Sequence, residues 1–355
     1  MVELYLRHCN MRLILFMLVL YIAPVFTLFG QKSFEGFEFF GNDSSIIECK
    51  IISDFKFLRK EKYKSAYQPA KFTLFTSEGD STTINIKIKA RGLFRRKHCL
   101  FPPFKIKFSK DDFVGSSVQE FNKLKLVTHC RSQPAYEQRV FEEYLIYKAY
   151  EMLTDYSLRV RMLRINYIDE GSKSDPGWNY AFLIEDPDQM AERNNAIELS
   201  IKNLHPEHTD RIVSTIMPVF QYMIGNTDWS VHAQHNIKLI KINDPSKYFP
   251  ITVPYDFDYC GLLNVPYAVP PEKLAIENIT ERIYRGFCRT DEEFQKVFDL
   301  FLTHKEEILA LFQNNELLTD KNKRICLEYL KEFFSIIENK KLGERTILSQ
   351  CRTNS

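Results

Sequence analysis

Hydrophobic residues change their spacing along the chain, from alternation in the first part to helical periodicity in the second. Between residues 33 and 110, β-branched and aromatic residues alternate or cluster in short runs separated by polar, turn-prone stretches. Such runs predict strands, which we expect to form a small antiparallel sheet. The predicted strands are Ile46 to Ile52, Lys71 to Phe75, Thr82 to Ala90 and Phe104 to Phe108.

The next segment, Pro134 to Leu153, repeats apolar residues with the spacing of a helix. Its stripe consists of Phe141, Leu145, Ala149 and Met152. Two further strands are predicted over Leu158 to Ile168 and Asn179 to Ile184, with a turn-rich stretch between them.

The remainder of the chain is mostly of helical pattern. An apolar periodic segment, Pro206 to Gly225, predicts a buried helix that ends at the glycine. Two short strands, Ile237 to Ile242 and Phe249 to Tyr255, predict a β-hairpin. Two long amphipathic helices are predicted over Asp291 to Phe312 and Asn315 to Ile337.

Polar residues cluster on both sides of this hairpin. The loop after Gly225 contains several polar side chains, and the second strand ends in Asp256-Phe257-Asp258. An Asp at the loop start can accept a proton, while an Asn amide oxygen and a strand-end carboxylate can hold a hard cation against phosphates. The loop residues are Asn226, Asp228, His232, His235 and Asn236.

Taken singly, Asn and Asp near a helix end or turn are more often present for local hydrogen bonds. Their order along the chain favours a nucleotide and metal site instead.

The stretches GNTDWS, HNIKLI and VPYDFDYCG resemble the signature of the CotH-type atypical kinases and, more distantly, that of the HipA-like kinases. This resemblance implies an α+β, bilobal protein-kinase-like fold with a strand-rich N-lobe and a mainly helical C-lobe. It implies Asp228 as catalytic base, Asn236 as metal ligand and Asp256 as principal metal ligand. Asn226 and Asp258 are supporting candidates, Asp258 for the metal.

One departure from the kinase pattern concerns the loop. Asp228 and Asn236 are eight residues apart, whereas the catalytic Asp and Asn of kinases are about five apart. Either the loop bulges by three residues, or another group is the base.

A dense basic segment, ARGLFRRKHCLFPPFKIKF, precedes the helix at Pro134. The resemblance implies Lys105 as the strand lysine that contacts the α- and β-phosphates, with Lys107 as its rival and Arg91 as a further cofactor-binding candidate. A lysine on a strand can neutralise phosphate oxygens as a fixed point charge. The alternative is a solvated basic edge strand. Gly92 is the one glycine of this segment, so a glycine-rich lid is not supported.

Two glutamates complete the set of candidates. In a kinase, the helix after the lysine strand carries the glutamate that pairs with the lysine, which implies Glu143. The alternative is a solvent-facing Glu143 paired with Arg139 or Lys148. Glu185, in FLIEDPDQMAER, would lie at a hinge that offers contacts to an adenine.

The N-terminus has the pattern of a secretory signal. Arg7 and Arg12 precede an apolar run that ends at Gly30. We expect residues 1–30 to be a cleaved signal, with a retained membrane anchor as the alternative. The protein is then exported, to the periplasm, the cell surface or the medium. Residues 31–186 would form the N-lobe and residues 187–355 the C-lobe.

The composition of the chain bears on which kinds of molecule the protein can bind. Of the 355 residues 45% are hydrophobic and 26% charged, and the net charge is +2, which gives no case for nucleic-acid binding. No membrane contact is expected beyond the N-terminal segment. In an oxidising compartment we expect the bridges Cys99–Cys130 and Cys260–Cys288, with buried free thiols as the alternative. Arg285 is a candidate for binding a substrate anion or, alternatively, for a structural ion pair.

The leading hypothesis is an exported kinase that uses ATP with Mg²⁺ or Mn²⁺. It would transfer a phosphoryl or nucleotidyl group to a protein or cell-surface acceptor, with Lys105 and Glu143 orienting the phosphates. A second hypothesis is a pseudokinase or binding module without turnover. A third is a metal-dependent hydrolase that uses His232, His235, Asp256 and Asp258, although no H-E-x-x-H spacing supports it.

Overall fold

The computed structural model describes residues 40, 46–64, 66–75, 81–108, 123–171 and 177–353. The chain divides into two units, Met1–Phe34 and Glu35–Ser355, and every described residue belongs to the second. The predicted signal or anchor over residues 1–30 lies outside the described residues. Within the described ranges, no helix combines the length and the apolar character needed to cross a membrane.

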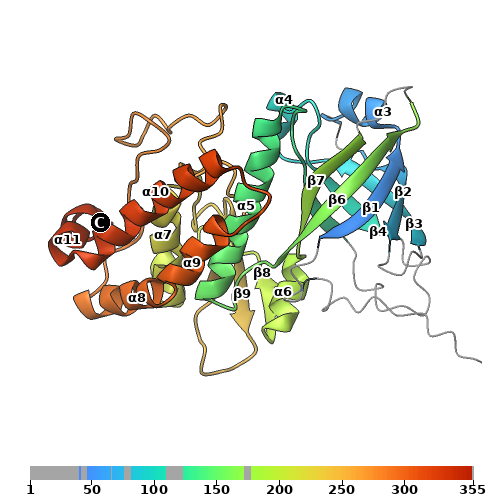
Figure 1. Ribbon diagram of the computed structural model, residues 1–355. Helices are drawn as coiled ribbons and strands as arrows, with labels where there is room; N and C mark the ends of the chain where they lie inside the picture. Colours follow the sequence, from blue (N-terminus) through green and yellow to red (C-terminus); the bar gives the residue numbers. More distant parts are fainter. Residues whose placement is uncertain are drawn as a thin grey trace, which may run out of the picture. The chain divides into compact units, whose positions relative to one another are not determined.

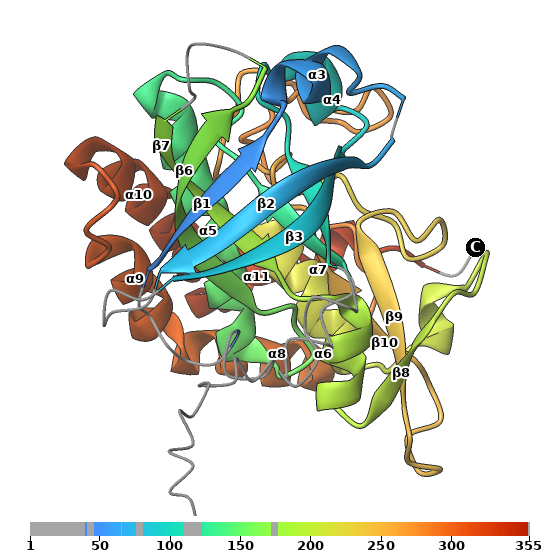
Figure 2. The same cartoon turned by 90° about the vertical axis from the view of Figure 1, so that its right-hand side faces the viewer.

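The strands of the first part of the chain form a closed barrel (Figures 1 and 2). The strand order around the barrel is β1-β2-β3-β4-β5-β7-β6. Neighbouring strands are antiparallel except β1 and β6, which pair in parallel from Ile47 opposite Leu163 to Ser53 opposite Asp169. The strands are β1 (Ile47–Ser53), β2 (Gln68–Phe75), β3 (Ser81–Ala90), β4 (Phe104–Phe108), β5 (Lys123–Val127), β6 (Val160–Asp169) and β7 (Gly177–Ile184).

This barrel corrects the expected fold class. The bilobal protein-kinase-like fold, with an antiparallel N-lobe sheet, is wrong, because the sheet closes on itself into a mixed barrel. The physical reason is the parallel pairing of β1 with β6. Closure pairs the backbone groups of two strands that would otherwise be exposed edges. The predicted division of the chain near residue 186 stays a prediction.

Strands β3, β4 and β5 have an apolar face and a lysine face. Their apolar residues, such as Ile88, Ile106 and Leu126, are buried. Their lysines lie opposite one another across the strands, in the rows Lys89–Lys105–Lys125 and Lys87–Lys107–Lys123. Residues of alternate parity point to opposite faces of a sheet, so these six lysines share one face, which we call the lysine face.

A second, three-stranded sheet has the order β10-β9-β8 and lies beside the barrel (Figure 2). Its strands are β8 (Ala196–Leu199), β9 (Ile237–Ile242) and β10 (Ile251–Pro254). β9 and β10 are the predicted hairpin. Helix α7 (Val213–Met223) packs on β10 and is buried along its whole length.

Helix α5 (Pro134–Leu153) lies between the barrel and the C-terminal helices (Figure 1). It contacts β6 and β7 on one side and α9 on the other. The predicted helix over 291–312 is two helices, α8 (Asp291–Thr303) and α9 (Lys305–Gln313), that meet at His304. The others are α3 (Phe55–Lys60), α4 (Arg95–His98), α6 (Pro187–Arg193), α10 (Asp320–Glu338) and α11 (Lys340–Thr346), with short 3₁₀ turns at Pro206–His208 and Leu348–Gln350.

Two disulfides are present in the part of the chain that the structure describes. Cys99–Cys130 is confirmed. The predicted Cys260–Cys288 bridge is wrong, because Cys288 is bonded to Cys351 and Cys260 is a buried free thiol. Cys260 is fully buried in the main core, where a thiol packs as a small apolar group.

Candidate functional site

The loop that follows α7 begins with a local hydrogen-bond turn. Gly225 has a left-handed backbone, with φ of +65°. Asn226 donates its side-chain amide to Gln221 at 3.0 Å, and its side-chain oxygen accepts from the backbone N–H of Asp228 at 2.9 Å. Both the amide and the oxygen of Asn226 thus take part in fixing the start of the loop.

The loop then reverses and returns to its start. Ser230 and His235 exchange both backbone hydrogen bonds, each at 2.9 Å. This pairing brings Asn236 back to Asp228, where its side-chain amide donates to the backbone carbonyl at 2.8 Å and to the carboxylate at 3.0 Å. The extra residues of the eight-residue spacing thus form a tight turn and do not separate the two side chains.

The end of β10 lies against this loop. The backbone N–H of Tyr255 donates to the carbonyl of Asn236 at 3.0 Å, and Asp256 follows directly. Asn236 and Asp256 have φ of +53° and +63°. A left-handed backbone is uncommon for residues other than glycine, and such conformations cluster at functional sites. The backbone N–H of Asp256 is held by the hydroxyl of Tyr147 at 2.8 Å.

The carboxylate of Asp256 is only loosely paired. It lies 3.6 Å from Nη2 of Arg91 and 3.7 Å from Nη2 of Arg95, and its side chain is 23% exposed. No side-chain hydrogen bond to it is present among the described residues. Burial opposes its charge, but Arg91 and Arg95 outweigh burial and lower the pKa of Asp256. It is therefore an ionised carboxylate with oxygen atoms available to a ligand.

Arg95 holds a second, tighter group of carboxylates. Its Nη2 lies 2.7 Å from Glu143 and its Nε lies 2.6 Å from Asp258. Asp258 also accepts a hydrogen bond from the hydroxyl of Tyr267 at 3.0 Å. Burial raises the pKa of Glu143, with Asp256 and Asp258 adding to the effect and Arg95 opposing it. Glu143 thus pairs with Arg95 and not with the strand lysine, and Asp258 is occupied by Arg95 and Tyr267.

The lysine face supplies the basic groups near Asp256. Lys105 is half-buried, and burial together with Arg91 and Lys89 lowers its pKa. Its neighbour Lys125, on β5, is also partly buried, and its Nζ lies 4.1 Å from the centre of the Tyr255 ring. Burial and then Arg91 lower the pKa of Lys125 to about 7, against the opposing charge of Asp256.

Lys125 is the functional candidate that sequence reasoning missed. Its Nζ lies over the ring of Tyr255, the residue directly before Asp256, and the charge of Asp256 opposes the lowering of its pKa. Lys107 is exposed, in the row further along the strands. The alternation of lysine and apolar residues in KLKLV, Lys123–Val127, is the sequence signal for the strand that carries Lys125. This strand is not among those predicted from the sequence.

Glu185 follows Ile184, the strand partner of Lys125, but its side chain is engaged elsewhere. It is buried and forms an ion pair with Arg193 at 3.0 Å, while its carboxylate also accepts from the backbone N–H of Arg159 at 2.9 Å. These contacts join the end of β7 to α6, which accounts for Glu185 as a structural residue.

The side chains at this end of the hairpin offer carboxylate and amide oxygens. Asn236 keeps its side-chain oxygen free of hydrogen bonds from the described residues, and its amide contacts Asp228. Mg²⁺ is usually held by one or two carboxylates together with phosphate oxygens and water. Within the described ranges, no group of three or more His, Cys, Asp and Glu side chains is placed to hold a metal ion of any kind. His235 instead contacts Asp228 at 2.8 Å.

Comparison with known proteins gives no further assignment. The sequence matches no protein-family model, and a search of curated proteins found no match.

Proposed function

We propose that this protein is a phosphotransferase that uses ATP and Mg²⁺ or Mn²⁺ to modify a protein or cell-surface acceptor. The observation that carries the proposal is the hydrogen bond between Tyr255 and Asn236. It joins the loop of Asp228 to the strand end that carries Asp256, and Tyr255 also contacts Lys125 of the lysine face. This supports a site formed by oxygen ligands from the two segments. Positioned charges of this kind are the main requirement for phosphoryl transfer.

Each residue of the cluster has a distinct role in this proposal. Asp256 and the side-chain oxygen of Asn236 would hold the metal ion, which would neutralise phosphate charge. Lys125, with Lys105 beside it on the next strand, would contact phosphate oxygens as point charges. Arg91 and Arg95 keep Asp256 ionised.

Asp228 would accept the proton of the acceptor hydroxyl. Its side chain is 38% exposed, so an acceptor can reach it. Asn236 and His235 both contact its carboxylate and fix its direction. The hydrogen bond to Asp228 raises the pKa of His235.

An exported location belongs to the same proposal. The disulfides Cys99–Cys130 and Cys288–Cys351 support it, because such bridges persist in oxidising compartments.

A thermal-shift titration with ATP and Mg²⁺ or Mn²⁺ tests the proposal. We expect the nucleotide to raise the unfolding temperature only with the metal, because ligands that bind the folded state stabilise it. Asp256→Asn should abolish this shift. Asp299→Asn, an exposed carboxylate on α8, is the matched control and should retain it.

The remaining outcomes separate the alternatives. A metal-dependent nucleotide shift without product, with Asp228→Asn unchanged, would indicate a nucleotide-binding module. A shift with zinc alone would indicate the hydrolase. The absence of any nucleotide shift in the wild-type protein would overturn the proposal.

A further inference from the structure

The residues that follow Asp228, from Trp229 to His232, form part of the wall of a pocket with a volume of about 230 Å³. Its walls combine apolar side chains with guanidinium groups. The lining residues that matter here are Met217, Trp229, Phe287, Arg285, Arg289 and Arg352. Ligand sites commonly pair an apolar wall with a few convergent polar groups.

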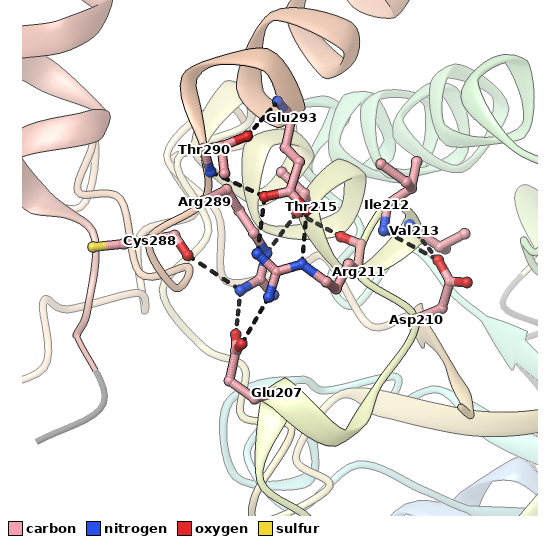
Figure 3. A network of polar contacts seen from close by, with 10 residues as sticks. All are labelled: Glu207, Asp210, Arg211, Ile212, Val213, Thr215, Cys288, Arg289, Thr290 and Glu293. Carbon is pink, nitrogen blue, oxygen red and sulfur yellow. Dashed lines mark hydrogen bonds and ion pairs between the residues drawn. The ribbon is translucent and has the colours of Figure 1, made fainter. Parts of the chain in front are cut away.

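Arg289 is the one of these arginines whose charge is already balanced. It forms an ion pair with Glu207 and donates from Nε to the hydroxyl of Thr215 at 3.1 Å (Figure 3). Glu207 also pairs with Arg211 at 3.0 Å, and Arg211 pairs with Glu293 (Figure 3). Arg289 is therefore a part of the scaffold that joins the 3₁₀ turn, α7 and α8.

Arg285 has no such balance. Its Nη1 donates to the carbonyls of Thr227 and Trp229, on either side of Asp228, and its guanidinium lies 5.2 Å from the centre of the Trp229 ring. Its Nε is buried without a hydrogen-bond partner. No carboxylate in the described part of the chain lies within ion-pair distance of it. The structural ion pair considered as the alternative for Arg285 is thus not formed with any described residue.

The C-terminal segment brings a second arginine to the same place. The Cys288–Cys351 disulfide fixes this segment beside Phe287. Two backbone hydrogen bonds of 2.9 Å, from Cys288 to Arg352 and from Arg352 to Gly286, fix the position of Arg352. Arg352 likewise has no ion-pair partner in the part of the chain that the structure describes. Burial and then the charge of Arg352 lower the pKa of Arg285 to about 10, with Asp228 opposing.

We propose that this pocket binds a phosphate monoester carried by the acceptor, with Arg285 and Arg352 contacting the phosphate oxygens. Two unbalanced guanidinium groups suit a dianion, and guanidinium recognises phosphate with paired hydrogen bonds. The apolar wall of Met217, Trp229 and Phe287 suits the carbon group that carries the phosphate. Its assignment to the acceptor rests on the proposed function, since Arg285 contacts both neighbours of Asp228.

Tryptophan fluorescence tests this site directly. The chain has two tryptophans, so Trp178→Phe leaves Trp229 as a reporter in the pocket wall. We expect saturable quenching or enhancement by phenyl phosphate, with weaker binding of inorganic phosphate and none of phenol. Arg352→Gln should weaken phenyl phosphate binding about tenfold or more, the loss of one charge-assisted contact. Arg345→Gln, an exposed arginine nearby on α11, should bind as the parent does.

A second variant tests the role of the C-terminal tether. Cys351→Ser removes the bridge without removing a charge, and we expect a loss of affinity similar to that of Arg352→Gln. The inference is overturned if phenyl phosphate does not bind, if phenol binds equally well, or if Arg352→Gln binds like the parent. Equal binding of inorganic phosphate would overturn the assignment to an acceptor-borne group. These titrations contain no ATP or metal, and Asp256→Asn should leave them unchanged, so they can succeed or fail independently of the proposed function.

Discussion

The side-chain amide of Asn236 donates two hydrogen bonds to Asp228, one to its backbone carbonyl at 2.8 Å and one to its carboxylate at 3.0 Å. One residue thus closes the loop and orients the candidate base. Its backbone carbonyl accepts from the N–H of Tyr255 at 3.0 Å, and Tyr255 directly precedes Asp256. The same residue therefore links the geometry of the proton acceptor to that of the proposed metal site.

Substitution of Asn236 should separate these two effects. Asn236→Ala loses the amide and also strains the left-handed backbone, so we expect a loss of unfolding free energy of roughly 1–3 kcal/mol in urea denaturation. In Asn236→Gly, glycine adopts the left-handed backbone without strain, so this variant should recover part of the lost free energy of unfolding. Both variants should need more Mg²⁺ to produce the ATP-dependent thermal shift. A normal Mg²⁺ requirement in Asn236→Gly would contradict a role of Asn236 as metal ligand.

Arg95→Met should be strongly destabilising. It leaves Glu143 and Asp258 without their shared partner in a buried place, and removing one member of a buried ion pair costs roughly 3–5 kcal/mol. Urea denaturation measures the loss. Lys97→Met, an exposed residue on the same short helix, is the control and should change stability by less than about 0.5 kcal/mol. Similar losses in the two variants would show that Arg95 has no special contribution.

Nucleotide binding should be coupled to proton uptake by Lys125. The pKa of Lys125 is about 7 in the free protein, because of burial and the nearby Arg91. At pH 8 the group is mostly neutral, and phosphate oxygens close to it would raise its pKa and protonate it. We therefore expect the calorimetric enthalpy of ATP binding at pH 8 to differ between HEPES and Tris buffers by the uptake of part of one proton. Lys125→Met should abolish this buffer dependence, and an unchanged dependence would assign the proton to another group.

His129 should make the protein less stable in acid. Burial lowers its pKa from 6.5 to about 4, so between these two pH values the unfolded chain binds a proton that the folded chain does not. The contribution of His129 to the free energy of unfolding is therefore fully present above pH 6.5. It is lost as the pH falls toward 4, by about 3 kcal/mol in total. Urea denaturation at several pH values measures the slope. His129→Phe, whose ring can keep the stack on Phe101, should remove this contribution; an equal slope in the variant would contradict it.

Several elements could be predicted from the sequence because their patterns are local. The strands Phe104–Phe108 and Ile237–Ile242 and the helix Pro134–Leu153 occur as predicted. Alternation shows which face of a strand is buried, but not which strand lies beside it. The parallel pairing of β1 with β6, and hence the barrel, depends on such a distant partner.

In the candidate site, too, contacts between residues close in sequence could be predicted, and contacts between distant residues could not. The positions of Asp228, Asn236 and Asp256 in the chain suggested that they meet, and the short segment between them limits where they can be. The partners of the basic residues were not accessible in this way. Arg95 belonged to a run of basic residues with nothing to distinguish it, although it is buried against three carboxylates from α5 and the end of β10. Cys351 likewise gave no sign that it pairs with Cys288.

The parallel pairing of β1 with β6 also has a consequence for synthesis on the ribosome. β1 cannot gain its second partner until β6, whose last residue is Asp169, has left the exit tunnel, and the barrel closes only after β7 has followed. Until then β1 presents an unpaired edge to the surroundings, and unpaired edges are sites of aggregation. The nascent chain therefore exposes an edge strand at which pairing with another chain can begin before folding is complete.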